Sequence, residues 1–104
     1  MGYLSNLARS NVVEHITLTT TDASAVQNAF IIIASEDLSD VAIQNLSDGG
    51  CYITFGTSAV TATINHLYMT GNSSVSLTNT KFNNFSVIRA TTDVSVRITG
   101  IGAE

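Results

Sequence analysis

The sequence predicts an all-β protein, an antiparallel β-sandwich of the jelly-roll type with about eight short strands. Hydrophobic residues make up 44% of the 104 residues and charged residues only 12%, a balance unlike that of disordered chains. Short segments of alternating apolar and polar residues recur along the chain at spacings of about 8 to 12 residues. Proline is absent, so the turns between these segments must depend on Gly, Asn, Asp and Ser.

Residues 1–11 predict an extended N-terminal arm, and residues 12–104 a single β-sandwich domain. Tyr3, Leu4 and Leu7 have helical spacing, but the segment is too short to be a stable helix by itself. Chain ends without a surface to dock on usually fray. We therefore expect the arm to dock on a neighbouring molecule in an assembly.

The first strand is expected at residues 12–21, where Val13, Ile16 and Leu18 are apolar and a run of threonines follows. Threonine has a high β propensity. The apolar alternation slips near Glu14 and His15, which indicates a β-bulge at this point.

The second strand is expected at residues 26–34, which end in a continuous apolar run from Ala29 to Ala34. Such a run is typical of a strand buried on both faces. A helix over residues 23–34 is the alternative, because the apolar residues there also fit a helical period. Three consecutive isoleucines are β-branched and favour the strand.

Residues 41–64 predict a hairpin followed by a further strand. Apolar alternation marks strands at 41–46 and 51–55. The segment Ser47–Gly50 between them contains an Asp, which bonds its own backbone in turns, and two glycines able to adopt positive φ. After Gly56 the alternation resumes at residues 60–64 and predicts the next strand.

Three more strands are expected at residues 74–78, 85–90 and 94–98. The turn before the first of them, residues 71–74, contains Gly and Asn. Strands joined by short turns are antiparallel neighbours, so we expect mainly antiparallel sheets.

No group of residues in the sequence predicts catalysis, a cofactor or a bound metal. A hydrolase or metal enzyme would need His15 and His66 to converge with a carboxylate, and neither histidine lies in a motif. Three carboxylates in residues 35–40 offer oxygen ligands for Ca²⁺, but their spacing differs from an EF-hand loop, which favours a solvated loop. Cys51 is the only cysteine, which excludes an intramolecular disulfide, and we expect it to be buried.

Charge and hydropathy limit the partners and the location. The net charge is −4 and the basic residues do not form a run, so no nucleic-acid partner is expected. The longest apolar run is far below the roughly 20 residues of a membrane-spanning helix, so we expect no membrane partner. The N-terminus lacks the pattern of a signal peptide, which favours a protein made in a cytoplasm and either left there or packed into something assembled there.

Residues 41–102 follow an ordered pattern: an apolar strand with Asn, a turn, a strand ending in Phe-Gly, an Ala-Thr segment, a Gly-containing turn and a closing Thr-Gly. The residues that carry it are Ile43, Asn45, Ile53, Phe55, Gly56, Val60, Ala62, Thr63, Gly71, Ile88, Ala90, Val94, Val96, Ile98, Thr99 and Gly100. This pattern resembles small virion structural proteins encoded near the capsid genes of tailed bacteriophages. It departs from them at residues 65–71, where their loop contains proline and this one does not.

The resemblance implies a capsid decoration, or cement, protein on the outer surface of the virion, with the major capsid protein as its partner. Such a protein stabilises the shell by bridging neighbouring capsomers through many contacts. Symmetry at local threefold positions implies a homotrimer. The expected capsid contacts lie in the arm: Tyr3, Leu4, Leu7 and Arg9.

The alternative is a receptor- or glycan-binding β-sandwich module of a phage tail or head fibre. In that case an exposed Tyr52, Tyr68 or Phe82 would stack on a sugar ring.

Overall fold

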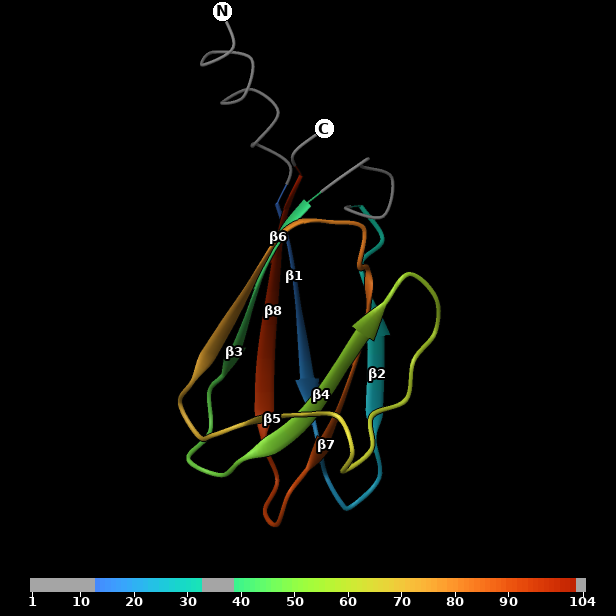
Figure 1. Ribbon diagram of the computed structural model, residues 1–104. Helices are drawn as coiled ribbons and strands as arrows, with labels where there is room; N and C mark the ends of the chain where they lie inside the picture. The colour runs from blue at the N-terminus through green and yellow to red at the C-terminus, as the bar shows by residue number, and fades with distance from the viewer. Residues whose placement is uncertain (1–12, 33–38, 103–104) are drawn as a thin grey trace, which may run out of the picture.

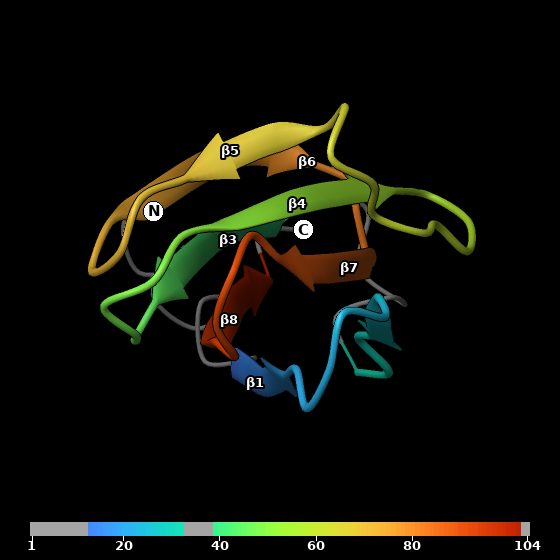
Figure 2. The ribbon, with the colours of Figure 1, turned by 90° about the horizontal axis from the view of Figure 1, so that it is seen from below.

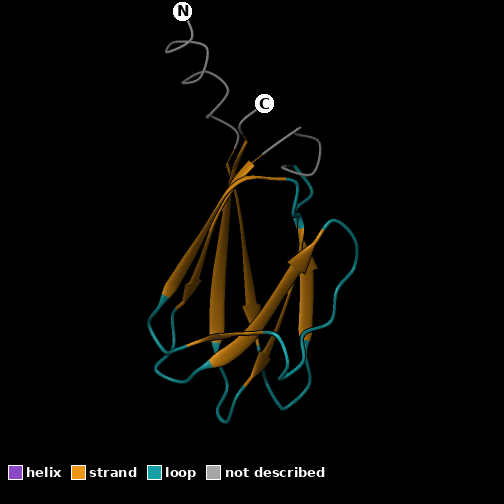
Figure 3. Cartoon of the chain, viewed as in Figure 1, coloured by secondary structure: helices purple, strands orange, loops and turns teal. Residues whose placement is uncertain are grey.

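A computed structural model describes residues 13–32 and 39–102. The arm residues Tyr3, Leu4, Leu7 and Arg9 lie outside the described residues, as does most of the acidic segment 35–40. The described part contains eight strands and, as Figure 3 shows, no helix that could cross a membrane. The strands are β1 (Val13–Thr19), β2 (Val26–Ala29), β3 (Ser39–Asn45), β4 (Cys51–Gly56), β5 (Leu67–Met69), β6 (Ser74–Thr80), β7 (Asn84–Arg89) and β8 (Ser95–Gly102).

The strands form two four-stranded sheets that pack face to face (Figures 1 and 2). Sheet A has the order β1-β8-β3-β6 and sheet B the order β2-β7-β4-β5, and every pairing is antiparallel. Eight strands in these two orders make a jelly roll. The predicted fold class is therefore confirmed.

The predicted hairpin at residues 41–55 is wrong, because β3 belongs to sheet A and β4 to sheet B. The turn between them carries the chain from one sheet to the other. Among the strands of the described residues, only β4 and β5 are neighbours both in sequence and in a sheet. Apolar alternation shows which side chains face the core, but it does not determine which strand lies alongside.

The strand predicted at 26–34 ends at Ala29, and the expected burial on both faces does not occur. Phe30 is buried and its N–H donates to the carbonyl of Asn83 at 2.8 Å, but Ile31 is 83% exposed. The Glu14 carboxylate accepts hydrogen bonds from the next two backbone N–H groups, those of Ile31 and Ile32, at 2.8 to 3.0 Å. The chain thus leaves sheet B after Ala29, and the Glu14 side chain of β1 binds the segment that follows. The helix alternative is also wrong for the described residues.

The predicted bulge in the first strand is absent, since β1 pairs with β8 in continuous register from Val13 to Thr19. Glu14 instead occupies an inward position of regular alternation and binds the segment after β2. The apolar alternation of residues 12–21 is interrupted because this carboxylate, and not an apolar side chain, occupies the inward position.

The strand predicted at residues 60–64 is a loop that lies over the outer face of sheet B. Ala62 is 2% exposed, and its N–H donates to the hydroxyl of Ser86 at 2.9 Å. The same hydroxyl donates to the carbonyl of Val26 at 2.9 Å. This buried serine on β7 therefore fastens the loop to the sheet at Ala62. Ile64, which shares the predicted apolar alternation, is 69% exposed, so the alternation of residues 60–64 marks neither a paired strand nor a buried face.

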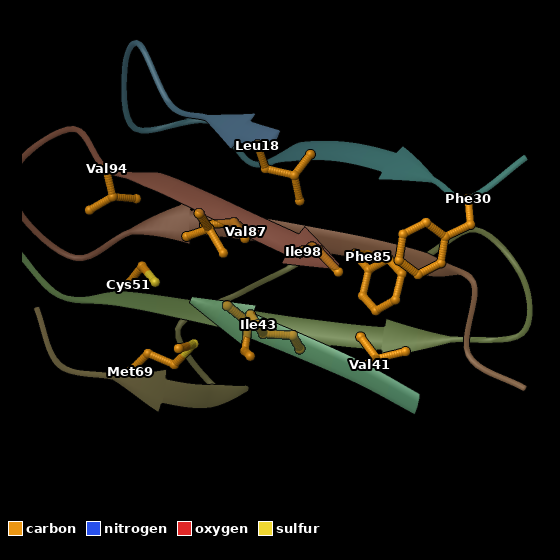
Figure 4. Close-up of a cluster of buried hydrophobic side chains, with 12 residues drawn as sticks. Leu18, Phe30, Val41, Ile43, Cys51, Met69, Phe85, Val87, Val94 and Ile98 are labelled. Atoms are coloured by element: carbon orange, nitrogen blue, oxygen red, sulfur yellow. The ribbon is translucent and has the colours of Figure 1, made fainter. Parts of the chain in front are cut away.

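The core lies between the two sheets (Figure 4). Its buried members are Leu18, Phe30, Val41, Ile43, Cys51, Ile53, Met69, Phe85, Val87, Val94, Val96 and Ile98. Phe30 and Phe85 meet edge to face with ring centroids 5.1 Å apart, a favoured aromatic geometry. Cys51 is buried as expected, and burial raises the pKa of its thiol to about 11.

Candidate functional surfaces

The side chains that could carry catalysis or bind a metal are dispersed. Within residues 13–32 and 39–102, no three His, Cys, Asp or Glu side chains gather where they could hold a metal ion. His15, on the outer face of sheet A, lies 2.9 Å from the hydroxyl of Thr99. His66 lies in the loop between β4 and β5 of sheet B, where its Nδ1 accepts the N–H of Thr63 at 2.9 Å. The structure does not bring the two histidines together.

Two shallow hollows lie on the surface of the described residues. One of about 200 Å³ lies on the outer face of sheet A between Ser76 and Ile101. Another of about 170 Å³ lies beside the β4–β5 loop, between Gln27 and Val60. Pockets that enclose a small-molecule ligand usually measure about 300 to 1,000 Å³. Exposed surfaces are therefore better candidates for function than these hollows.

Two of the three aromatic residues proposed for sugar stacking lie side by side on the outer face of sheet B. Tyr52 of β4 is opposite Tyr68 of β5, and their rings are 5.2 Å apart at 58°. Tyr68 is 50% exposed, and its hydroxyl lies over Gly50, where any Cβ would overlap it. Phe82 is half-buried against Phe55, with ring centroids 5.1 Å apart. The candidate aromatic surface is thus the tyrosine pair.

A second surface, which the sequence analysis missed, is the apolar end, defined as Val13, Ile31, Ile32 and Ile101. All four are exposed aliphatic residues. Val13 of β1 is opposite Ile101 of β8, and the adjacent Glu14 binds the backbone of Ile31 and Ile32, which places all four at one end of the sandwich. Figure 1 shows β1 beginning and β8 ending at this end. The sequence predicts that the isoleucine run belongs to the core. Glu14, a carboxylate among the apolar residues of β1, is the sequence feature that could have indicated the exposed position of Ile31 and Ile32.

Comparison with known proteins defines the class of fold. No family model matches the sequence, and neither does any curated protein. Similar solved structures include cupin proteins and other jelly rolls. The chain spans 66% of a cupin protein from Bacteroides fragilis and 52% of a cupin domain protein from Schizosaccharomyces pombe.

Three of these structures illustrate the likeness. The Bacteroides fragilis cupin has 10% identity over 88% of this chain, with a TM-score of 0.52. A de novo designed double-stranded β-helix has 14% identity and a TM-score of 0.52 over 84% of this chain and 97% of its own. A protein of Bacillus endospore appendages, which form disulfide-linked pili, has 20% identity and a TM-score of 0.56 over 88% of this chain and 87% of its own. At these identities the likeness shows the fold alone.

Proposed function

We propose that this protein is a capsid decoration protein of a tailed bacteriophage, which binds the outer shell through the major capsid protein and bridges neighbouring capsomers as a homotrimer. The observation that carries the proposal is the apolar end, where the described part of the chain begins at Val13. Apolar side chains gathered at one exposed position are typical of a surface that binds another protein.

The proposed arm contacts and the apolar end would act together. Tyr3, Leu4 and Leu7 supply apolar side chains just before β1, and Ile31 offers an aliphatic surface at the place where β1 begins. Fully burying one such side chain contributes about 1.5 to 3 kcal/mol. When several linked copies bind one capsid lattice, the overall affinity exceeds the affinity of each single contact.

Deletion of residues 1–11 is expected to weaken binding to bare capsids about tenfold or more, which equals about 1.4 kcal/mol or more, while the sandwich stays folded. Co-sedimentation of purified protein with capsids measures the affinity, and thermal unfolding checks the fold. Ile31→Ser should weaken binding in the same assay. Leu46→Ser is the matched control, because Leu46 is also exposed but follows β3 at the opposite end. Equal capsid affinity of the deletion variant and the intact chain would contradict the proposal.

A second candidate function, glycan binding by a receptor-binding module, is favoured by the tyrosine pair. Sugar rings stack on exposed aromatic faces, and Tyr68 presents such a face. A glycan array should then give a saturable ligand whose binding is lost in Tyr68→Ala and retained in Tyr68→Phe, which keeps the ring. Binding that survives Tyr68→Ala would rule out this surface.

A further inference from the structure

The two sheets have edges of unequal length. The edge strands of sheet B, β2 and β5, contain four and three residues, whereas those of sheet A, β1 and β6, contain seven each. Proteins commonly prevent edge-to-edge pairing with short edge strands, proline, bulges or charged side chains. Sheet B is protected by its short edges, and sheet A lacks this protection.

The sequences of the two long edges offer little other protection. β6 reads SVSLTNT and contains neither a charge nor a proline. Its irregularity opposite Ser39 and Val41 lies beyond Leu77, so Ser74–Leu77 is regular. In β1 the one carboxylate, Glu14, already binds the backbone of the segment after β2.

The hydrogen bonding of β1 shows which of its peptide groups point away from sheet A. The N–H of Thr20 donates to the carbonyl of Val94 at 2.9 Å, so Thr20 faces β8. Because pairing alternates along an antiparallel strand, Leu18 also bonds to β8, while the N–H and C=O groups of Thr17 and Thr19 point outward. These groups have no strand partner among the described residues.

The same reasoning applies to β6. The N–H of Asn45 donates to the carbonyl of Ser73 at 2.9 Å, so Ser73 and, two residues later, Val75 bond to β3. The N–H and C=O groups of Ser74 and Ser76 then point to the open side. They too lack a strand partner in the part of the chain that the structure describes.

The directions of the two edges fit each other. Sheet A has four strands, each antiparallel to the next, so β1 and β6 run in opposite directions. A second copy placed beside the first, in the same orientation, therefore sets its β1 antiparallel to β6 and continues the alternation of the sheet.

We propose that copies of this chain associate by pairing β6 of one copy with β1 of the next, which joins their A sheets into one. One register aligns the inner and outer faces of the two A sheets. In it, residues 74–77 of one copy lie opposite residues 19–16 of the next, in that order, so that Ser74 is opposite Thr19 and Leu77 is opposite Ile16. Hydroxyl side chains then meet on the outer face, where Ser and Thr pairs are favourable. Aliphatic side chains meet on the inner face.

The inner face gains from this pairing. Ile16, Val75 and Leu77 are only partly buried and lie at the margin of the core cluster. A neighbouring strand covers this margin and removes apolar surface from water, which stabilises the association. Such an interface is head-to-tail, so it closes into a ring or extends as a fibre according to the rotation between copies. The inference deepens the self-association in the proposed function, since a homotrimer requires a head-to-tail interface, but it does not depend on a capsid.

Proline substitutions test both edges without breaking bonds inside the subunit. The N–H groups of Thr17 and Ser76 point away from sheet A, so proline removes a donor that no bond inside the subunit uses. Edge strands tolerate proline at such positions. The intact chain should show a mass above that of the monomer by size-exclusion chromatography with light scattering. Thr17→Pro and Ser76→Pro should each be monomeric, with association weakened about 100-fold or more. Gln27→Pro, on the short edge strand β2, is the matched control and should associate like the intact chain.

A mixture of the two variants distinguishes pairing of β6 with β1 from pairing of two identical edges. Thr17→Pro retains a usable β6 and Ser76→Pro a usable β1, so an equimolar mixture should form dimers and nothing larger. An interface between identical edges would be lost in one variant only and would overturn the proposal. So would an intact chain that remains monomeric at millimolar concentration.

Hydrogen exchange of the intact chain tests the same interface without any substitution. The amides of Thr17, Thr19, Ser74 and Ser76 should exchange more slowly as protein concentration rises, while that of Leu18 is protected throughout. Unchanged exchange at these four amides in the associated state would overturn the proposal. Capsid co-sedimentation of Thr17→Pro separates the two proposals, because a monomer that still binds capsids leaves the decoration function standing.

Discussion

Replacement of Asn45 by alanine is expected to lower the free energy of unfolding by about 3 kcal/mol, because its side chain joins two turns in the interior. Asn45 is 2% exposed at the end of β3. Its Nδ2 donates to the carbonyls of Gly49 at 2.9 Å and Thr70 at 3.1 Å, and its Oδ1 accepts the N–H of Ser47 at 3.0 Å. One amide thus connects the β3–β4 turn to the β5–β6 turn.

The size of the effect follows from the groups left behind. Alanine removes these three bonds and a longer one from Nδ2 to the Sγ of Cys51 at 3.8 Å. Each buried polar group left without a partner costs about 1 to 3 kcal/mol, and water that enters the space lowers this cost. Urea denaturation measures the change. Gln44→Ala is the control: the adjacent residue is exposed, and its replacement should change stability by less than about 0.5 kcal/mol. Equal stability of the two variants would show that Asn45 does not join the turns.

Side-chain periodicity predicted the faces of the strands well where one face is buried and the other polar. In β8, Val96 and Ile98 are buried and the intervening Arg97 is exposed, as the alternation indicated. The fold class followed from about eight short strand patterns at regular spacing, although the pattern at residues 60–64 is a loop in the structure. Strand pairing was not predictable in this way, because an alternating strand of a jelly roll carries no mark of which neighbour it pairs with.

The candidate surfaces were predicted less well, and for a different reason. Ile31 and Ile32 are β-branched residues typical of a core strand, yet both are exposed, and their backbone N–H groups bind a carboxylate that is distant in sequence, that of Glu14. Tyr52 and Tyr68 were recognised as aromatic candidates, but only the pairing of β4 with β5 makes them neighbours. The arm contacts remain predictions, since they lie outside the described residues.

The sequence offers turn glycines that are able to adopt positive φ, and the structure gives them another role. No described glycine has a positive φ, and the residue that adopts the left-handed conformation is Asn72, at 59°. The glycines are instead sites of close approach. Gly71 lies against the backbone of Asp48, so the β5–β6 turn packs directly on the β3–β4 turn.

Replacement of Gly71 by alanine is therefore expected to destabilise the protein by about 3 kcal/mol, the upper range for forcing an extra methyl group into a packed site. A Cβ at Gly71 would overlap the carbonyl group of Asp48 and lie 2.9 Å from its Cα. Backbone atoms cannot rotate away as a side chain does. Asn72 also holds the turns together, since its N–H donates to the carbonyl of Ser47 and its Nδ2 to the Asp48 carboxylate, both at 2.9 Å.

Gly56→Ala is the matched control for this substitution. A Cβ at Gly56 would meet a side-chain atom, the Cγ1 of Val60, at 3.2 Å, a contact that a shift of a few tenths of an ångström relieves. Urea denaturation should thus show a large loss for Gly71→Ala and a small one for Gly56→Ala. If Gly71→Ala retained full stability, the two turns would have to separate without cost, and Asn45→Ala would then be expected to do little as well. The two substitutions consequently test one contact from both sides.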